Sequence, residues 1–508
     1  MPVTLSPRWH AVALFLCCAF VSLIYTPVTG TYYCGFDDFM ELHRAAFEDS
    51  QNPSHIWTDT HRGSNKYRPI YRLANDVTFW WGHGAPIAYR VRNLVLHCLT
   101  VATVYLLGLT LFSWPVAVGG ALLFGLHPLT HQAVAVAVFY NPGPNMQFLL
   151  TIALFLVGYR AARPLTRWLA ISFGLLSGCI ALFTYEPSLV AFGLLYTYLV
   201  IDFLVTGKRP PLRFVLLLTL GVALTVASYF LTRRLLITSP PTNYVVTAPL
   251  IIIRNLAMYI IALFLPVDSI LAHDWFGTPL PRYIQFTAKL WVLLGVVGST
   301  ILASLWFFRR TIGRRLRELP LTATLFLLVA TVSSLALFLL FTDHASETYV
   351  AVPAAFFSVA FCGVLWHWCR PRPLFYGLTL GLLISLNALA CWNRGERIIS
   401  CGDIASRLVA DLPAQFRQGP ATIWLSNYPG DEQSLAYGIY GYKGLDTLGP
   451  DSETVQAAVQ TVFFNQQLQV RRVSPAELLN AAKQPLPGHH YYFVHSDGTL
   501  GPARGALF

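Results

Sequence analysis

The stretch YYCGFDDFMELHRAAFED (residues 32–49) follows the first apolar segment of the chain, residues 9–26. Two adjacent aspartates, Asp37 and Asp38, therefore stand close to the point where a predicted membrane helix emerges. Ionisable side chains at membrane depth are costly and are functional candidates by default. The rest of the sequence decides whether these carboxylates lie at a membrane, and on which side of it.

The composition predicts an α-helical polytopic membrane protein. Of the 508 residues, 55% are hydrophobic and 12% are charged, whereas soluble proteins carry about 25% charged residues. The mean hydropathy is +0.53. Apolar runs that can cross a bilayer as helices recur at residues 9–26, 91–112, 114–138, 145–159, 168–185, 187–205, 213–233, 286–308, 320–342, 350–369 and 373–391. We expect about 11 spans, and the first is interpreted as an uncleaved anchor rather than a signal peptide.

The apolar stretch 248–266 is interpreted as a possible re-entrant helix. It contains Arg254, which would be costly against lipid, and non-lipid-facing backbone is tolerated only inside protein.

Short basic loops predict the orientation, because such loops stay cytoplasmic. They read RAARPLTR (160–167), TGKRPPLR (206–213), RRTIGRRLRE (309–318) and RPRP (370–373). The amino terminus is then inside, and residues 27–90 and everything after about 391 are outside. The polar segment 392–508 contains two predicted strands, ATIWLSN (421–427) and HHYYFVHS (489–496), and two predicted helical stretches, 452–467 and 474–483. We therefore expect a transmembrane domain, residues 1–391, and a small extracytoplasmic α/β domain, residues 392–508.

The outer loop 27–90 predicts two amphipathic helices lying at the membrane interface. The first places apolar residues on one face and charges on the opposite face: Phe39, Leu42, Ala46 and Phe47. The second, PIYRLANDVTFWWGHG (69–84), does the same with Ile70, Leu73, Val77 and Trp80 or Trp81. Together they could cover a cavity between spans.

Cations in this loop suit a lipid phosphate, because guanidinium groups bind phosphate in a bidentate manner. They are Arg44, Arg62, Lys66, Arg68, Arg72 and Arg90. The alternative is ordinary ion pairing with the loop's own acids, Asp38, Glu41, Glu48 and Asp49. Most of the net charge of +11 has a topological role, so we expect no nucleic acid partner.

Other outer loops hold ionisable residues that would each, alone, be interpreted as solvated loop residues. They are His127, His131, Glu186, Asp343, His344 and Glu347, with Tyr349 beside them. His127 and His131 are four residues apart, but they do not form an HExxH motif, and we expect no metal site. The nine cysteines show no CxxC motif, and a Cys391–Cys401 disulfide outside the membrane is possible.

Five motifs in order resemble the GT-C class of multi-span glycosyltransferases, in particular the transmembrane and tetratricopeptide-repeat O-mannosyltransferases and their bacterial relatives. The motifs are FDDFMEL (36–42), residues 67–107 with Asn93 and His97, LLFGLHPLTHQAVAVAVFYNPG (122–143), LFTYEPS (182–188) and ASETYVAVPAAFF (345–357). The chain departs from the family at Gln132, where relatives have Glu, and at Thr348, where they have Arg. No tetratricopeptide repeat follows.

The resemblance implies inverting transfer of a sugar from a polyprenyl-phosphate donor to a protein, lipid or glycan acceptor, without a cofactor. The reaction would occur on the extracytoplasmic face of a bacterial inner membrane. Asp37 would be the base and Asp38 its partner in acceptor binding, although the reverse assignment stays open. Arg68 and Arg72, four residues apart, would hold the donor phosphate, and His127, His131, Glu186, Glu347 and Tyr349 would line the cavity.

Three alternatives remain open from the sequence. The aspartates could merely cap a helix. An O-antigen polymerase or ligase would share lipid-linked substrates, but would place its large outer loop late in the chain. A transporter would show internal hydropathy repeats and broken helices at mid-bilayer, and the sequence shows no clear repeat.

Overall fold

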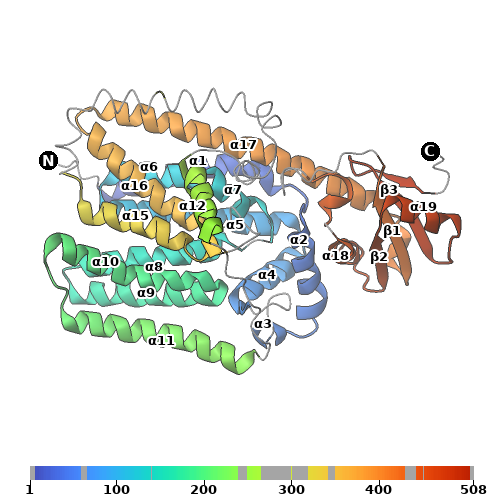
Figure 1. Cartoon of the computed structure of the whole chain (residues 1–508), viewed down its shortest axis with the longest axis horizontal. Helices are drawn as coiled ribbons and strands as arrows, with labels where there is room; N and C mark the ends of the chain where they lie inside the picture. Colours follow the sequence, from blue (N-terminus) through green and yellow to red (C-terminus); the bar gives the residue numbers. More distant parts are fainter. Residues whose placement is uncertain are drawn as a thin grey trace.

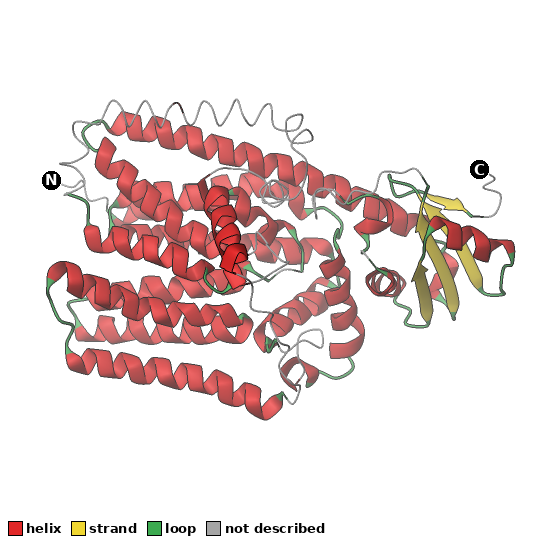
Figure 2. Ribbon diagram, viewed as in Figure 1, coloured by secondary structure: helices red, strands yellow, loops and turns green. Residues whose placement is uncertain are grey.

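The computed structural model describes residues 6–58, 66–138, 140–237, 249–264, 299, 318–340, 349–429, 442–449 and 451–503. Most of them form a bundle of long helices, and a small α/β domain projects from one end of it (Figures 1 and 2). The predicted fold class, a helical membrane protein with a small C-terminal α/β domain, is therefore confirmed.

Eight helices among the described residues are long and apolar enough to cross a membrane. They are α1 (Pro7–Thr29), α5 (Pro86–Leu111), α9 (Pro164–Thr184), η3 with α10 (Glu186–Leu189, Val190–Thr206), α11 (Leu212–Leu236), α15 with η4 (Leu321–Leu335, Phe338–Leu340), α16 (Ala351–Cys369) and α17 (Pro373–Asp411). The predicted span 145–159 is α8 (Pro142–Arg160), which is helical but not among the eight. The predicted span 286–308 lies outside the described residues.

The predicted span 114–138 was wrong as a single helix. It consists of α6 (Trp114–Gly125) and α7 (Pro128–Ala135), and Val136, directly after α7, has an extended backbone. The break has a local cause, because Pro128 cannot continue the hydrogen bonding of a helix interior. The stretch 248–266 forms α12 (Pro249–Phe264). The Arg254 side chain lies outside the described part, and the re-entrant interpretation stays a prediction.

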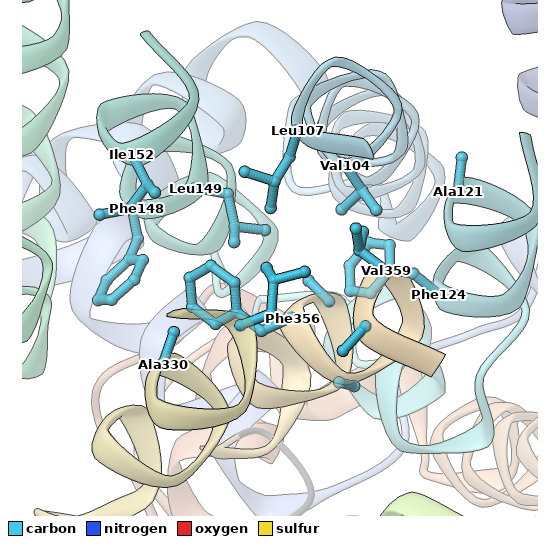
Figure 3. Close-up of a cluster of buried hydrophobic side chains, with 14 of the residues drawn as sticks. Val104, Leu107, Ala121, Phe124, Phe148, Leu149, Ile152, Ala330, Phe356 and Val359 are labelled. Atoms are coloured by element: carbon cyan, nitrogen blue, oxygen red, sulfur yellow. The ribbon is translucent and has the colours of Figure 1, made fainter. Parts of the chain in front are cut away.

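The bundle core is a continuous cluster of apolar side chains at the meeting of α5, α6, α8, α15 and α16 (Figure 3). Val104 and Leu107 of α5 face Phe356 and Val359 of α16 across this cluster. Small residues let the helices approach closely: a Cβ on Gly108 would lie 2.8 Å from the Ala117 Cα. Close approach through small residues is how membrane helices gain contact without a hydrophobic driving force.

The two ends of the bundle differ. The turns that join α8 to α9, α10 to α11 and α16 to α17 lie at one end, together with the amino terminus (Figure 1). These turns carry three of the four basic loops. The outer-loop helices and the α/β domain lie at the opposite end (Figure 1).

The α/β domain has a four-stranded sheet of order β2-β1-β3-β4. Its strands are β1 (Ala421–Asn427), β2 (Leu468–Arg472), β3 (His489–Val494) and β4 (Leu500–Pro502). Strand β1 pairs in parallel with β2 and β3, and β4 runs antiparallel to β3. Helices α18 (Ser452–Phe463) and α19 (Pro475–Lys483) each begin with a capping box, at Asp451 and Ser474, which satisfies their first amides.

Helix α17 runs unbroken through the expected domain boundary at residue 391 and ends at Asp411. It therefore joins the bundle to the α/β domain as one rigid element. Cys391 and Cys401 both lie on it, and ten residues of helix separate their Cα atoms by roughly 15 Å. A disulfide needs less than about 7 Å, so the possible Cys391–Cys401 pair is excluded.

Candidate active site

Helix α2 (Phe36–His43) carries the two aspartates in its first turn. Gly35 is its N-cap, with a φ of 131° that favours glycine, and no side chain caps the helix. The side chain of Asp37 lies outside the described part of the structure. Asp38 is fully buried: its Oδ1 accepts from the Val138 amide at 3.0 Å, and its Oδ2 accepts from the Cys34 amide at 3.3 Å. Asp38 therefore ties α2 to the chain that follows α7.

Side chains from α5 satisfy the backbone carbonyls of Ala135, at the end of α7, and of the non-helical residues that follow it. Arg90 donates to Ala135 at 3.0 Å, Asn93 donates to the next two carbonyls at 3.0 Å, and Arg92 also reaches the second of these, at 3.3 Å. Buried carbonyls need such partners. The sequence marked Arg90 only as a possible phosphate ligand and Asn93 only as a motif position. Their close spacing with Arg92 is the signal that was missed.

A buried network of charges joins α2 and the π-helical η1 (Arg44–Asp49) to α4 (Pro69–Gly82). Arg44 contacts Glu41 at 2.7 Å, Asp49 at 2.8 Å and Asp76 at 3.4 Å, and Arg72 donates to Asp49 at 2.5 Å. The first predicted amphipathic helix has both its apolar residues and the charged Asp38, Glu41, Arg44 and Asp49 buried, whereas Glu48 is exposed.

Three carboxylates, those of Glu41, Asp49 and Asp76, and two guanidinium groups, those of Arg44 and Arg72, meet in this network. Burial, opposed by Arg44 and reinforced by the neighbouring Asp49 carboxylate, raises the pKa of Asp76 to about 7. The Asp76 carboxyl is therefore easier to protonate than an exposed aspartate.

Helix α4 turns its polar face into the protein. Arg72 and Asp76 are buried, whereas Val77 is 49% exposed and Trp81 is 80% exposed. A buried polar face and an exposed apolar face suit a helix that lies between a polar protein interior and a membrane interface, where tryptophan is favoured. The predicted helix is confirmed, and its interfacial position stays a prediction.

Arg68 precedes α4 and meets Glu186, which lies at the turn between α9 and α10. Arg68 Nε donates to Glu186 Oε2 at 2.8 Å, and the guanidinium lies 4.6 Å from the centre of the Tyr185 ring. Within the ranges that the structure describes, the two Nη atoms of Arg68 and Oε1 of Glu186 make no hydrogen bond. Within those ranges, the pair therefore has donor and acceptor atoms that no described protein group engages.

Aromatic side chains surround this pair. Tyr67 packs edge-on against Phe183 at 6.2 Å, and Tyr229 contacts both, at 6.1 and 5.3 Å. The sequence motifs did not predict these three as site residues, although Tyr67 adjoins Arg68 in the chain and Phe183 lies in the same motif as Glu186.

The remaining predicted site residues contact different partners. Arg72 is engaged with Asp49, whereas Arg68 is engaged with Glu186. His127 caps α7, accepting from the Leu129 amide, and donates to the Leu263 carbonyl at 3.1 Å. His131 stacks on Tyr25 with ring centres 5.4 Å apart.

Tyr349 stacks on Phe338 at 4.3 Å. Glu347 lies outside the described residues. Where the structure describes the chain, no three His, Cys, Asp or Glu side chains group closely enough to hold a metal ion.

No family model and no curated protein matches the chain. Among solved structures, the chain is similar to the archaeal oligosaccharyltransferase AglB from Archaeoglobus fulgidus, in complex with an inhibitory peptide and a dolichol-phosphate. The identity is 11%, the TM-score is 0.50, and the match covers 91% of this chain and 64% of that protein. The chain thus spans under two thirds of the length of AglB.

A second similar structure is ArnT from Cupriavidus metallidurans bound to undecaprenyl phosphate. It shares 13% identity and a TM-score of 0.50, and the match covers 97% of this chain and 98% of ArnT. At these identities the similarity concerns the fold. The chain therefore has the fold of the GT-C glycosyltransferases, as the resemblance of its sequence motifs predicted.

Proposed function

We propose that this protein is an inverting glycosyltransferase that moves a sugar from a polyprenyl-phosphate donor to an acceptor on the extracytoplasmic side of the membrane. The Arg68–Glu186 pair carries the proposal, because among the described residues no partner occupies its remaining hydrogen-bonding atoms, and the pair lies beside aromatic rings at the outer-loop end of the bundle. Two proteins of the same fold have been solved with a polyprenyl-type phosphate.

In this proposal Arg68 binds the donor phosphate. Glu186 engages Nε, on the side of the guanidinium away from its fork, so both Nη groups can face two phosphate oxygens. Such bidentate pairs are short, strong and specific in geometry. As the sugar leaves, negative charge grows on the phosphate, and a positioned cation stabilises it.

The acceptor hydroxyl needs a base. Asp38 is committed to two backbone amides, which leaves its neighbour Asp37 as the carboxylate that we propose for this role. Attack on the side opposite the leaving phosphate inverts the anomeric carbon. The acceptor is a protein, lipid or glycan that carries a free hydroxyl.

The charge of the loops supports the proposed side of the membrane. Three basic loops lie at the end opposite α2 and α4, and basic loops stay cytoplasmic. The proposed site would then face outward.

The experiment is a direct assay on purified protein in lipid nanodiscs. Undecaprenyl-phosphate-linked sugars are supplied with extracts of surface glycans and proteins, and release of free undecaprenyl phosphate is followed. Wild type should release it from at least one donor, and Asp37→Asn should not. Turnover only with lipid-linked oligosaccharides would favour the polymerase or ligase alternative.

A further inference from the structure

In the C-terminal domain, another segment of the same chain lies at the crossover point of the sheet. From the central β1 the chain crosses first to β2 and then to β3 on the other side. In open α/β sheets the crevice at such a point, beyond the carboxyl ends of the strands, is where ligands bind. Here the short helix η8 (Gly444–Thr447) lies there.

Two hydrogen bonds hold η8 in this place. The Gly444 amide donates to the Ser496 carbonyl at 3.2 Å, and the Leu445 amide donates to Asn427 Oδ1 at 2.9 Å. A Cβ on Gly444 would lie 2.9 Å from that Asn427 oxygen, and the φ of Gly444 is +51°, so glycine is needed for the fit. The crevice therefore binds a segment of this chain.

That segment reaches the helix of the candidate active site. The Thr447 carbonyl, at the end of η8, accepts from the amide of Gly35 at 3.3 Å. Gly35 is the N-cap of α2. The domain thus contacts α2 at its first turn, which contains Asp37 and Asp38.

The other end of α2 is held by α18. His43 Nε2 and Gln460 Oε1 are 2.9 Å apart. The assignment of donor and acceptor is clear, because Gln460 Nε2 already donates to the Gln466 carbonyl at 3.0 Å and the Leu468 carbonyl at 2.8 Å. Its oxygen therefore accepts, and the proton lies on His43 Nε2.

Between these two bonds the contact is apolar. Phe39 and Leu42 of α2 belong to one buried cluster with Val455 and Val459 of α18. A helix of only two turns has little stability of its own, so its position depends on such tertiary contacts.

We propose that the C-terminal domain positions α2 for sugar transfer, and that His43 and Gln460 are positioning residues for the aspartates. The inference rests on the proposed function, since it assigns the domain a role in that same site. Neither contact involves Arg68 or Glu186, so the loss of either contact should lower kcat and leave donor binding unchanged.

The test uses His43→Phe, which keeps the ring that packs on Phe47 at 4.9 Å but removes the hydrogen-bond donor. Two readouts are compared with wild type in full-length protein: kcat and donor KM, and hydrogen exchange of the peptide covering residues 36–49. His43→Gln retains an N–H donor and is the conservative variant. His55→Phe is the matched control, because His55 lies on α3 (His55–Thr58) and pairs with Asn52.

We expect His43→Phe to lower kcat about fivefold, the equivalent of one hydrogen bond, at unchanged donor KM, and to speed exchange in α2. His43→Gln should recover both, and His55→Phe should match wild type. Unchanged exchange and kcat in a folded His43→Phe protein would overturn the inference. If wild type transfers no sugar, the proposed function fails, while the exchange experiment still shows whether the domain holds α2.

Discussion

Arg68 Nε and Glu186 Oε2 lie 2.8 Å apart, although 118 residues separate them in the sequence. Their side chains are 14% and 28% exposed, so the pair is neither sealed in the core nor fully solvated. An ion pair of this kind contributes little stability by itself, about 0–1 kcal/mol. Its importance lies in how it orients the guanidinium fork.

Replacement of Arg68 should weaken donor use. Arg68→Ala removes a charge-assisted hydrogen bond worth about 1.5–3 kcal/mol, so donor KM should rise about tenfold to a hundredfold. Arg68→Lys keeps the charge but lacks the planar fork, and should recover activity only in part. Arg209→Ala is the control, because Arg209 lies in the turn between α10 and α11, and that turn is at the opposite end of the bundle (Figure 1). Donor kinetics unaffected in Arg68→Ala would place the phosphate site elsewhere.

Replacement of Arg72 should act mainly on stability. Arg72 is 2% exposed and bonded to Asp49, and removing one partner of a buried pair costs about 3–5 kcal/mol. Arg72→Ala should therefore melt well below wild type in detergent, whereas Arg68→Ala should melt close to it. Thermal unfolding of the two variants side by side gives the comparison. A stable Arg72→Ala protein with raised donor KM would favour the sequence prediction that Arg72 holds phosphate.

The stability should depend on pH through Asp76. Its carboxyl pKa is raised from 3.8 to about 7, so the folded state binds more protons than the unfolded state between these values. This contribution is complete below the unfolded pKa and is lost as pH rises through the folded pKa. Asp76→Asn should lack it, so the melting temperature of wild type should fall relative to Asp76→Asn from pH 5 to pH 8. Parallel pH profiles for the two proteins would show that Asp76 is ionised throughout.

Replacement of Asp38 should lower stability, whereas replacement of Asp37 should lower activity. Asp38→Asn leaves one acceptor oxygen for two buried amides, which should cost about 1–3 kcal/mol of stability. Asp37→Asn should fold like wild type and lose transfer by at least about a hundredfold, as expected for a general base. Activity and melting temperature are measured on both. Full activity in a normally folded Asp37→Asn would move the base to another residue.

The apolar runs predicted most of the membrane helices, because crossing a bilayer requires length and hydropathy that sequence displays directly. They failed at residues 114–138, where an apolar run is interrupted and then unwound. The unwound part persists because Arg90, Asn93 and Asp38 satisfy its backbone. Those partners come from other helices, and no local pattern reveals them.

The candidate site was predicted only in part for the same reason. Motif order marked Arg68 and Glu186 separately, but their pairing depends on how α4 meets the turn after α9. The helical spacing placed Arg68 and Arg72 on one face, yet Arg72 turns to the buried acid Asp49. The helical period of 3.6 residues predicts which side chains share one face of a helix. It does not predict which residues of other elements those side chains contact.

The central claim is that this protein consumes a polyprenyl-phosphate-linked sugar, and one measurement tests it most directly. Lipid extracts and surface glycans of the native host are analysed by mass spectrometry in three strains: wild type, deletion, and deletion complemented with Asp37→Asn. The account predicts that the last two accumulate the same polyprenyl-phosphate sugar and lack the same glycan or glycosylated lipid. Identical lipid-linked sugars and identical surface glycans in all three strains would contradict it.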